Sequence, residues 1–218
     1  MAIDSALREL LSTGARELGL TLTKDQLDAC FLFHSELKKW NRKINLTAID
    51  DDREIIIKHF LDSFSYLQGF NAAPGQTLLD LGSGAGFPAL PLKIVCPGLS
   101  ITMVESVKKK ASFLRHMIRT LGVQNTAVVD QRTETMPASY LKTFDIVTAR
   151  AFADMETALS QGVRFLKPEG LMVLSRGPEE TVSDAVLGAS GMALVKRTAF
   201  SLPGTDYRRA LWVFQRTG

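Results

Sequence analysis

A short apolar run that leads into an acidic residue and three closely spaced glycines constrains this chain more than any other segment. Residues 78–86 read Leu-Leu-Asp-Leu-Gly-Ser-Gly-Ala-Gly, so the glycines are Gly82, Gly84 and Gly86. The apolar run is typical of a buried parallel strand. Glycine permits a tight turn after such a strand and lets a ligand approach the backbone, because it has no Cβ. The segment therefore predicts a strand followed by a ligand-binding loop and a helix.

The spacing of these glycines separates two classes of nucleotide-binding enzyme. A dinucleotide-binding fingerprint has the spacing G-x-G-x-x-G and would place its third glycine where Phe87 stands. The third glycine here comes one residue earlier, at Gly86, and Pro88 suits the first turn of a helix. The acidic-x-G-x-G-x-G pattern resembles motif I of the class I S-adenosylmethionine-dependent methyltransferases. The resemblance implies S-adenosylmethionine as the cofactor. The alternative is an NAD-dependent dehydrogenase, which a titration with the two cofactors distinguishes.

The hydrophobic pattern divides the chain into a helical extension and an α/β domain. Residues 1–70 carry apolar residues at helical spacing, and Pro74 and Gly75 then mark a loop. Over residues 71–218, short apolar runs alternate with helical segments, which predicts a mainly parallel sheet. We therefore expect the Rossmann-like α/β fold of class I methyltransferases, a seven-stranded sheet with helices on both faces, plus an N-terminal helical extension. The expected strands cover residues 77–81, 99–105, 126–130, 144–149, 171–175, 194–201 and 209–215.

Composition bounds the cellular setting and the partners. The chain has 218 residues, of which 45% are hydrophobic and 22% charged, as in soluble globular proteins. No apolar run approaches the ~20 residues of a membrane-spanning helix, and the N-terminus lacks the apolar core of a signal peptide. Cys30 and Cys96 are too far apart for a metal-binding motif, so we expect buried thiols and no metal. We expect a cytoplasmic monomer that contacts no membrane, and the net charge of +3 permits a nucleic-acid partner.

Several polar residues fall at the carboxyl ends of the expected strands, where ligands of parallel α/β sheets bind. Asp80 and Glu105 end the first two strands, and Thr133 and Glu134 follow the third. A carboxylate at Glu105 has lone pairs for both ribose hydroxyls of the cofactor. The alternative is an exposed acid that only precedes a helix. Thr133 and Glu134 lie where this fold usually recognises adenine.

Arg150 ends the fourth strand beside the expected reaction centre. We expect it to orient the methyl donor and the target base; the alternative is a salt bridge to Asp154 or another acid. His59 and Asp62 lie three residues apart on a helix expected from about residue 51. For this pair, a local hydrogen bond that fixes the helix is favoured over catalysis.

The residues after the fourth strand also restrict the methyl acceptor. Methylation of exocyclic amines typically uses an Asn/Asp-Pro-Pro-aromatic tetrapeptide there, but residues 148–152 read Thr-Ala-Arg-Ala-Phe. Cytosine C5 methylation usually needs an attacking cysteine, and Cys96 lies at a helix end in the wrong context. A ring nitrogen such as guanine N7 already has a free lone pair, so an enzyme acts on it chiefly by alignment. The missing base and nucleophile are therefore consistent with N7 chemistry.

Four motifs along the chain carry a family resemblance through their order and spacing, and they lie in residues 40–47, 59–63, 80–88 and 150–153. From about residue 25 to the C-terminus, the chain resembles the bacterial ribosomal RNA small subunit methyltransferase G family, also called glucose-inhibited division protein B. This resemblance implies methyl transfer to guanine N7 in the decoding-region (530) loop of 16S ribosomal RNA, with the RNA or the 30S subunit as the partner. The alternatives are a class I methyltransferase acting on another RNA, a protein or a small molecule, and an RNA-binding module without activity.

The resemblance also implies roles for residues at the cofactor. Gly82 and Phe87 match positions that contact the donor. Thr133 and Glu134 match the adenine-side pair. Arg150 matches an arginine at the face shared by donor and RNA, and it is the expected catalytic residue. Together with the residues argued above, the expected cofactor-binding set is Asp80, Gly82, Gly84, Gly86, Phe87, Glu105, Thr133, Glu134 and Arg150.

Basic residues are the expected RNA contacts. Lys109, Arg132 and Arg209 match basic positions of the RNA surface that the resemblance implies. The family usually has Lys-Gly after the fifth strand, where this chain has Arg176 and Gly177. We expect Arg176 to bind RNA with a donor geometry that differs from that of lysine. For Lys109 and its neighbours, the alternative is an ordinary solvated helix face.

Overall fold

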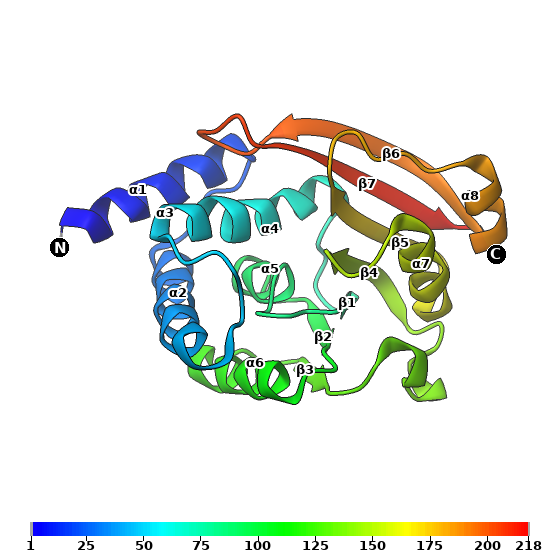
Figure 1. Ribbon diagram of the computed structural model, residues 1–218, viewed down its shortest axis with the longest axis horizontal. Helices are drawn as coiled ribbons and strands as arrows, with labels where there is room; N and C mark the ends of the chain where they lie inside the picture. The colour runs from blue at the N-terminus through cyan, green and yellow to red at the C-terminus, as the bar shows by residue number, and fades with distance from the viewer. Residues whose placement is uncertain (1, 218) are drawn as a thin grey trace.

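A seven-stranded sheet crosses the part of the chain that the structure describes, residues 2–217 of the computed structural model (Figure 1). The strands are β1 (Thr77–Leu81), β2 (Ser100–Val104), β3 (Thr126–Val129), β4 (Phe144–Arg150), β5 (Leu166–Arg176), β6 (Met192–Ser201) and β7 (Arg208–Arg216). Their order is β3-β2-β1-β4-β5-β7-β6, and β7 runs antiparallel to both of its neighbours. The pairings from β3 to β5 are parallel, which confirms the expected class I methyltransferase fold.

Helices cover both faces of the sheet, as the alternating pattern predicted. The α-helices are α1 (Ala2–Glu17), α2 (Lys24–Ile44), α3 (Asp52–Ile55), α4 (Asp62–Ser65), α5 (Ala89–Val95), α6 (Lys108–Leu121), α7 (Met155–Gly162) and α8 (Asp184–Ser190). Adjacent residues of a strand face opposite sides, so Leu78 packs into the core with α5 and α6, and Leu79 packs with α7. In Figure 1, α5 and α6 lie on one side of the central strands and α7 and α8 on the other. The short α8 was not predicted from the sequence.

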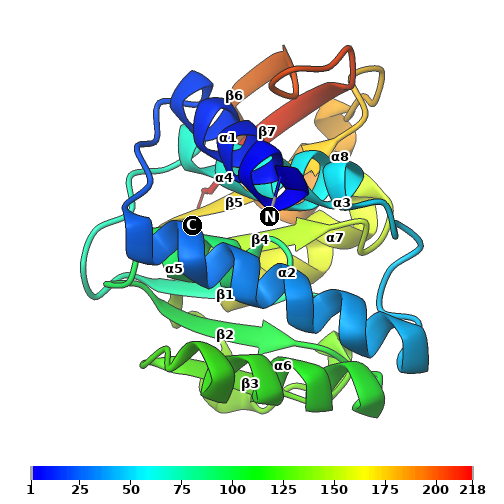
Figure 2. The same cartoon turned by 90° about the vertical axis from the view of Figure 1, so that its left-hand side faces the viewer.

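The N-terminal helices share their core with the sheet. Thr23 caps α2 in a capping box: its hydroxyl accepts from Gln26 N at 3.2 Å, and Gln26 Oε1 accepts from Thr23 N at 2.9 Å. Gln26 also donates to Val95 O at 3.3 Å, which ties the start of α2 to the end of α5. Buried Phe33 and Leu37 complete the contact of α2 with α5 and α6 (Figure 2). The division of the chain at residue 70 stays a prediction, since the packing continues across it.

A helical segment with a π turn reaches the carboxyl edge of the sheet. It comprises α3, a π-helical turn (Ile56–Leu61), α4 and a 3₁₀ turn (Tyr66–Gln68). The helix expected from about residue 51 is confirmed, because Asp51 caps it by accepting from Glu54 N at 2.9 Å; the π turn was not predicted. The buried Tyr66 hydroxyl donates to Ala149 O and accepts from Ser175 N, both at 3.2 Å. These bonds fix the segment against the ends of β4 and β5.

The fifth strand begins earlier than its sequence indicates. Turn-forming residues 167–170 predicted a loop before a strand at residue 171, yet β5 starts at Leu166. Phe144 pairs with Leu166 and Ile146 pairs with Leu171, so the turn residues form a bulge within the strand.

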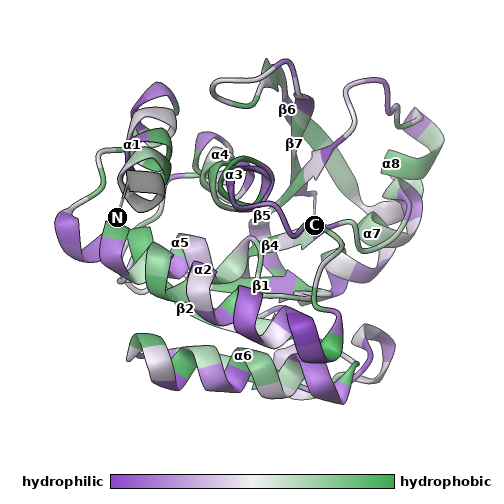
Figure 3. Ribbon diagram, turned by 60° about the vertical axis from the view of Figure 1, so that its left-hand side comes forward, coloured by the Kyte–Doolittle hydropathy of each residue, from purple (hydrophilic) through white to green (hydrophobic). Residues whose placement is uncertain are grey.

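Hydropathy varies along the helices as expected for packing on a sheet. Figure 3 shows hydrophilic and hydrophobic residues interleaved along α6, whose buried residues include Phe113 and Leu114. Among residues 2–217, the structure has no helix with the length and apolar character needed to cross a membrane.

Candidate active site

The glycine loop follows β1 and turns sharply beside Phe152. Gly82 and Gly86 have φ angles of 65° and 91°, which residues with a Cβ rarely adopt. A Cβ on Gly82 would lie 2.6 Å from Cδ2 of Phe152, so the loop requires glycine there. Ser83 N donates to Val104 O at 2.9 Å, which holds the loop against the end of β2. The predicted tight turn therefore forms at the carboxyl edge of the sheet.

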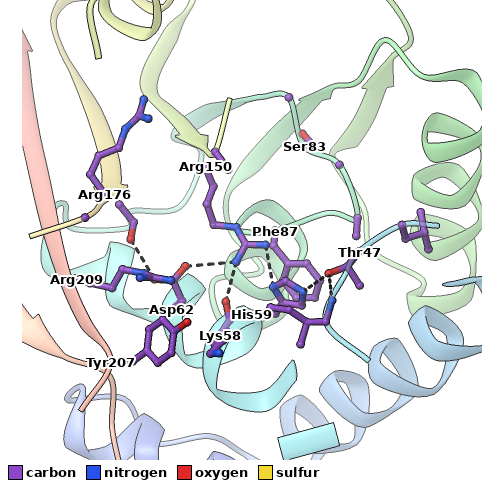
Figure 4. A pocket seen from close by; sticks show the side chains of 18 of the residues that line it. Thr47, Lys58, His59, Asp62, Ser83, Phe87, Arg150, Arg176, Tyr207 and Arg209 are labelled. Carbon is purple, nitrogen blue, oxygen red and sulfur yellow. Dashed lines mark hydrogen bonds and ion pairs between the residues drawn. The ribbon is translucent and has the colours of Figure 1, made fainter. Parts of the chain in front are cut away.

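Two cavities meet at Gly82, which lines both. The first, of about 620 Å³, lies between the glycine loop and the π-helical segment (Figure 4). The second, of about 380 Å³, lies between the loop and the residues that follow β2 and β3. Residues that line the first cavity include Thr47, Lys58, His59, Asp62, Gly82, Gly84, Phe87, Lys110, Arg150, Arg176 and Arg209. Residues that line the second include Gly82, Glu105, Arg132, Thr133, Glu134 and Phe152.

Glu105 follows β2 and is buried, so the alternative of an exposed acid is wrong. Its Oε2 accepts from Gly84 N at 2.9 Å, and its Oε1 accepts from Val107 N at 2.7 Å. The carboxylate thereby ties the glycine loop to the start of α6. Each carboxylate oxygen has a second lone pair, which is available to a ribose hydroxyl in the second cavity. The role of Glu105 at the ribose stays a prediction.

Asp80 lies beneath the glycine loop and lines neither cavity. Its side chain is fully buried: Oδ1 accepts from Thr148 Oγ1 at 2.8 Å, and Oδ2 has no hydrogen-bond partner among the described residues. Burial raises the pKa of Asp80 to about 6. The Asp80 carbonyl accepts from Ser83 Oγ at 3.0 Å, so Asp80 supports the loop from below. The expected contact of Asp80 with the cofactor stays a prediction. From beneath the loop, Asp80 affects a bound cofactor through the position of the glycine loop.

Thr133 and Glu134 line the second cavity together with Arg132, on the far side of Glu105 from the glycine loop. Thr133 is buried and Glu134 is exposed. Glu134 accepts from Gln161 at 2.8 Å, which draws its carboxylate toward α7. This placement suits the predicted adenine-side role.

Arg150 lines the first cavity, and it is held there by three groups of the π-helical segment (Figure 4). Its Nη1 donates to Lys58 O at 2.9 Å and to Asp62 Oδ2 at 3.3 Å, and its Nη2 lies 3.0 Å from His59 Nδ1. The expected acidic partner, Asp154, instead caps α7. Arg150 thus combines the two roles that the sequence offered as alternatives: it pairs with an acid, Asp62, and it lines the candidate site.

His59 and Asp62 do not form the local hydrogen bond that their spacing suggested, because each bonds to Arg150. The His59 ring stacks on Phe87 at 4.6 Å, and its Nε2 lies 2.9 Å from Thr47 Oγ1. Burial and the adjacent Arg150 lower the pKa of His59 to about 3, so the ring is neutral. The sequence did not lead us to expect that these two residues contact Arg150. The motif at residues 59–63 was the feature of the sequence that marked both positions.

Phe87 contributes little surface to the first cavity, because its ring is 2% exposed. It stacks between Phe33, at 4.8 Å, and His59. The Arg150 guanidinium lies 5.3 Å from the centre of the same ring. The expected donor contact of Phe87 stays a prediction, and these packing contacts already occupy most of its ring.

The predicted RNA-binding residues occupy two kinds of position. Arg209 lines the first cavity and donates to Asp62 Oδ1 at 3.3 Å. Arg176 also lines it but is buried, with Nη1 donating to Ala153 O at 2.6 Å, so RNA reaches it only from within the cavity. Lys109 and Arg132 are exposed. Lys110, the neighbour of Lys109 on α6, lines the first cavity.

Solved structures similar to this one include proteins that depend on or bind S-adenosylmethionine. The structure is similar to a SAM-dependent methyltransferase from Aquifex aeolicus, with a TM-score of 0.58 and 17% identity over 83% of this chain and 97% of that one. It is also similar to TYW2 of M. jannaschii in complex with AdoMet, with a TM-score of 0.51 and 12% identity over 67% of this chain and 70% of that one. The glycine cradle, the Glu105 carboxylate and the two joined cavities suit that cofactor. The fold and site define a class I S-adenosylmethionine-dependent methyltransferase.

Sequence relatives narrow the class further. The sequence model of the rRNA small subunit methyltransferase G family matches residues 26–192. Ribosomal RNA small subunit methyltransferase G of Geobacter sp. (strain M21) is 44% identical over 98% of this chain and 99% of its own length. The protein of the same name from Myxococcus xanthus is 36% identical over 98% of this chain and 99% of its length. The chain belongs to the rRNA small subunit methyltransferase G family.

Proposed function

We propose that this protein transfers a methyl group from S-adenosylmethionine to N7 of a guanine in the decoding-region (530) loop of 16S ribosomal RNA. The family description and the names of the relatives support small-subunit ribosomal RNA as the substrate class. The observation that carries the proposal is that the glycine loop and Arg150 line one cavity. The substrate is 16S RNA or the 30S subunit, and we expect the protein to act on it as a monomer in the cytoplasm.

The second cavity suits the adenosine portion of the cofactor. Glu105, Thr133 and Glu134 line that cavity together. In this proposal, Glu105 accepts hydrogen bonds from the ribose hydroxyls, and Thr133 and Glu134 contact the adenine. Gly82 lines both cavities, and because it is a glycine it has no side chain that would fill either of them. When bound, S-adenosylmethionine supplies a methyl group that its sulfonium already activates.

The first cavity suits alignment of a base rather than its deprotonation. The Asp62 carboxylate already accepts hydrogen bonds from Arg150, Arg209 and Ser175, so its oxygens are engaged by the protein itself. His59 is neutral, but its Nδ1 lone pair faces Arg150. Guanine N7 needs no proton removed before it attacks the methyl group, so holding base and donor in line supplies the main rate advantage.

Cations around the first cavity suit a polyanionic substrate. Lys58, Lys110 and Arg209 line it, and Lys109 and Arg132 lie exposed beside the two cavities. Such residues bind phosphates, which positions an RNA without reading its sequence.

The test is label transfer from methyl-labelled S-adenosylmethionine to 16S RNA and 30S subunits from a strain that lacks this gene. We expect label in these substrates and none in subunits from the intact strain, whose site is already methylated. Label in protein or small molecules instead would favour another class I methyltransferase function.

A further inference from the structure

Thr47 stands in the wall of the first cavity opposite the strand ends, and none of the site roles above uses its hydroxyl. It follows α2, and its backbone N donates to Asn41 Oδ1 at 2.9 Å, which fixes the residue in place. The side chain is half-buried and points toward His59 (Figure 4). The groups around Thr47 determine which atom donates in each hydrogen bond to its hydroxyl oxygen.

The first proton position is set by Arg150. A guanidinium donates hydrogen bonds and cannot accept them, so His59 Nδ1, 3.0 Å from Arg150 Nη2, must present a lone pair. The neutral His59 ring then carries its only N–H at Nε2. Nε2 lies 2.9 Å from Thr47 Oγ1, and it therefore donates to that oxygen.

The second proton position is set by the backbone. Ile49 N donates to the same Thr47 Oγ1 at 3.1 Å. A hydroxyl has two acceptor lone pairs and one donor proton, so both lone pairs are occupied. No hydrogen bond among the described residues uses the Thr47 hydroxyl as a donor. The hydroxyl is thus locked as a donor, and its proton is free for a ligand in the cavity.

We infer that Thr47 is a specificity-determining residue that donates its hydroxyl proton to O6 of the target guanine. The inference rests on the proposed function, because it takes guanine as the acceptor. Guanine presents N7 and O6, both acceptors, on one edge, whereas adenine presents N7 beside an amino donor. A free hydroxyl rotates to suit either partner, but one whose lone pairs are filled accepts nothing from an amino group. The bonds from His59 and Ile49 therefore turn Thr47 into a selector for guanine.

The carboxylate of the methyl donor is the alternative acceptor for this hydroxyl proton, and the experiment below distinguishes it from guanine O6. We favour the base because Thr47, Lys58 and His59 form the wall contributed by the N-terminal helices. The predicted donor contacts that line the cavities come instead from the strand ends and the loops after them, and among these Arg150 and Phe87 reach His59.

The experiment compares guanine with 2-aminopurine, which keeps N7 and lacks O6, at the target position of 16S RNA. Single-turnover methylation is measured at saturating donor for the wild type, Thr47→Val and Thr47→Ser, alongside donor affinity. Thr198→Val, on β6 away from the cavities, is the matched control. We expect Thr47→Val to slow methylation of guanine about 10- to 100-fold and to leave the 2-aminopurine rate unchanged, with Thr47→Ser close to wild type.

Four results would overturn the inference. Equal slowing of both bases by Thr47→Val would show a structural role, and weakened donor binding with an unchanged base ratio would assign the hydroxyl to the donor. A wild type that leaves guanine N7 unmethylated would overturn the proposed function as well. If the wild type methylates guanine but Thr47→Val leaves the ratio of the guanine rate to the 2-aminopurine rate unchanged, only the assignment to Thr47 is overturned.

Discussion

Arg150 and the buried Asp62 form an ion pair at 3.3 Å, although 88 residues separate them in the sequence. The same Asp62 carboxylate accepts from Ser175 Oγ at 3.0 Å and from Arg209 Nε at 3.3 Å. One side chain from the N-terminal extension therefore joins the ends of β4 and β5 with the start of β7. The extension builds part of the candidate site rather than only covering it.

Replacing Asp62 by alanine is expected to lower the free energy of unfolding by about 3–5 kcal/mol, because it leaves two arginines facing a buried gap. The measurement is urea unfolding. The control is Asp28→Ala, which removes an exposed ion pair with Arg8 and is expected to cost at most about 1 kcal/mol. Equal losses for the two variants would show that the Asp62 contacts contribute little.

Arg150→Ala is expected to slow single-turnover methylation at saturating donor by about 10²–10³-fold, because it removes the cation that faces the reacting groups. Arg150→Lys should recover little, since a lysine cannot reproduce the forked contacts to Asp62 and His59. Arg164→Ala is the control: Arg164 is exposed near the start of β4, at the other end of the strand that Arg150 closes. Near-normal turnover by Arg150→Ala would contradict its role.

Gly82 and Gly191 offer a matched pair, because both have a φ angle of 65°. Alanine at either position should cost about 1–2 kcal/mol of stability through backbone strain. At Gly82 the new Cβ would also collide with Phe152, whereas among residues 2–217 nothing lies within 4 Å of one at Gly191. We expect calorimetry to show weakened S-adenosylmethionine binding for Gly82→Ala alone, and equal affinities would argue against the loop as the donor site.

Asp80 should make stability depend on pH. Its pKa is raised by burial to about 6, above that of the unfolded chain, so its contribution is full below about pH 4 and is lost as the pH rises through about 6. Asp80→Asn should match the wild type at pH 4 and exceed its unfolding free energy by about 3 kcal/mol at pH 7.5. The exposed Asp206→Asn is the control for denaturation measured across this range. A difference that does not change with pH would mean that Asp80 keeps an ordinary pKa.

The glycine loop and the strand ends were predictable from the sequence because they depend on local signals. The apolar run and the glycines lie within residues 78–86, and Glu105 comes directly after its own strand, β2. The contacts of His59 and Asp62 were not predictable, because the π turn and the long-range approach to Arg150 leave no local pattern. Spacing along one helix suggested that the two residues bond to each other.

Burial of particular side chains was the other feature that the sequence concealed. Phe87 follows the glycine loop and was expected to contact the donor, yet its ring packs between Phe33 and His59. Arg176 was expected among exposed RNA contacts, yet it is buried with a bond to Ala153. Both depend on which distant segments fold over the loop.

Chemical mapping of the modified base tests the central claim most directly. 16S RNA from a strain lacking this gene is methylated by the purified protein, then reduced with borohydride and cleaved with aniline, which cuts the chain at N7-methylguanosine. Primer extension locates the cut. We expect one new cut, at a guanosine of the decoding-region loop. A methylated RNA with no cut there, or with the methyl group on a different base, would contradict the proposed function.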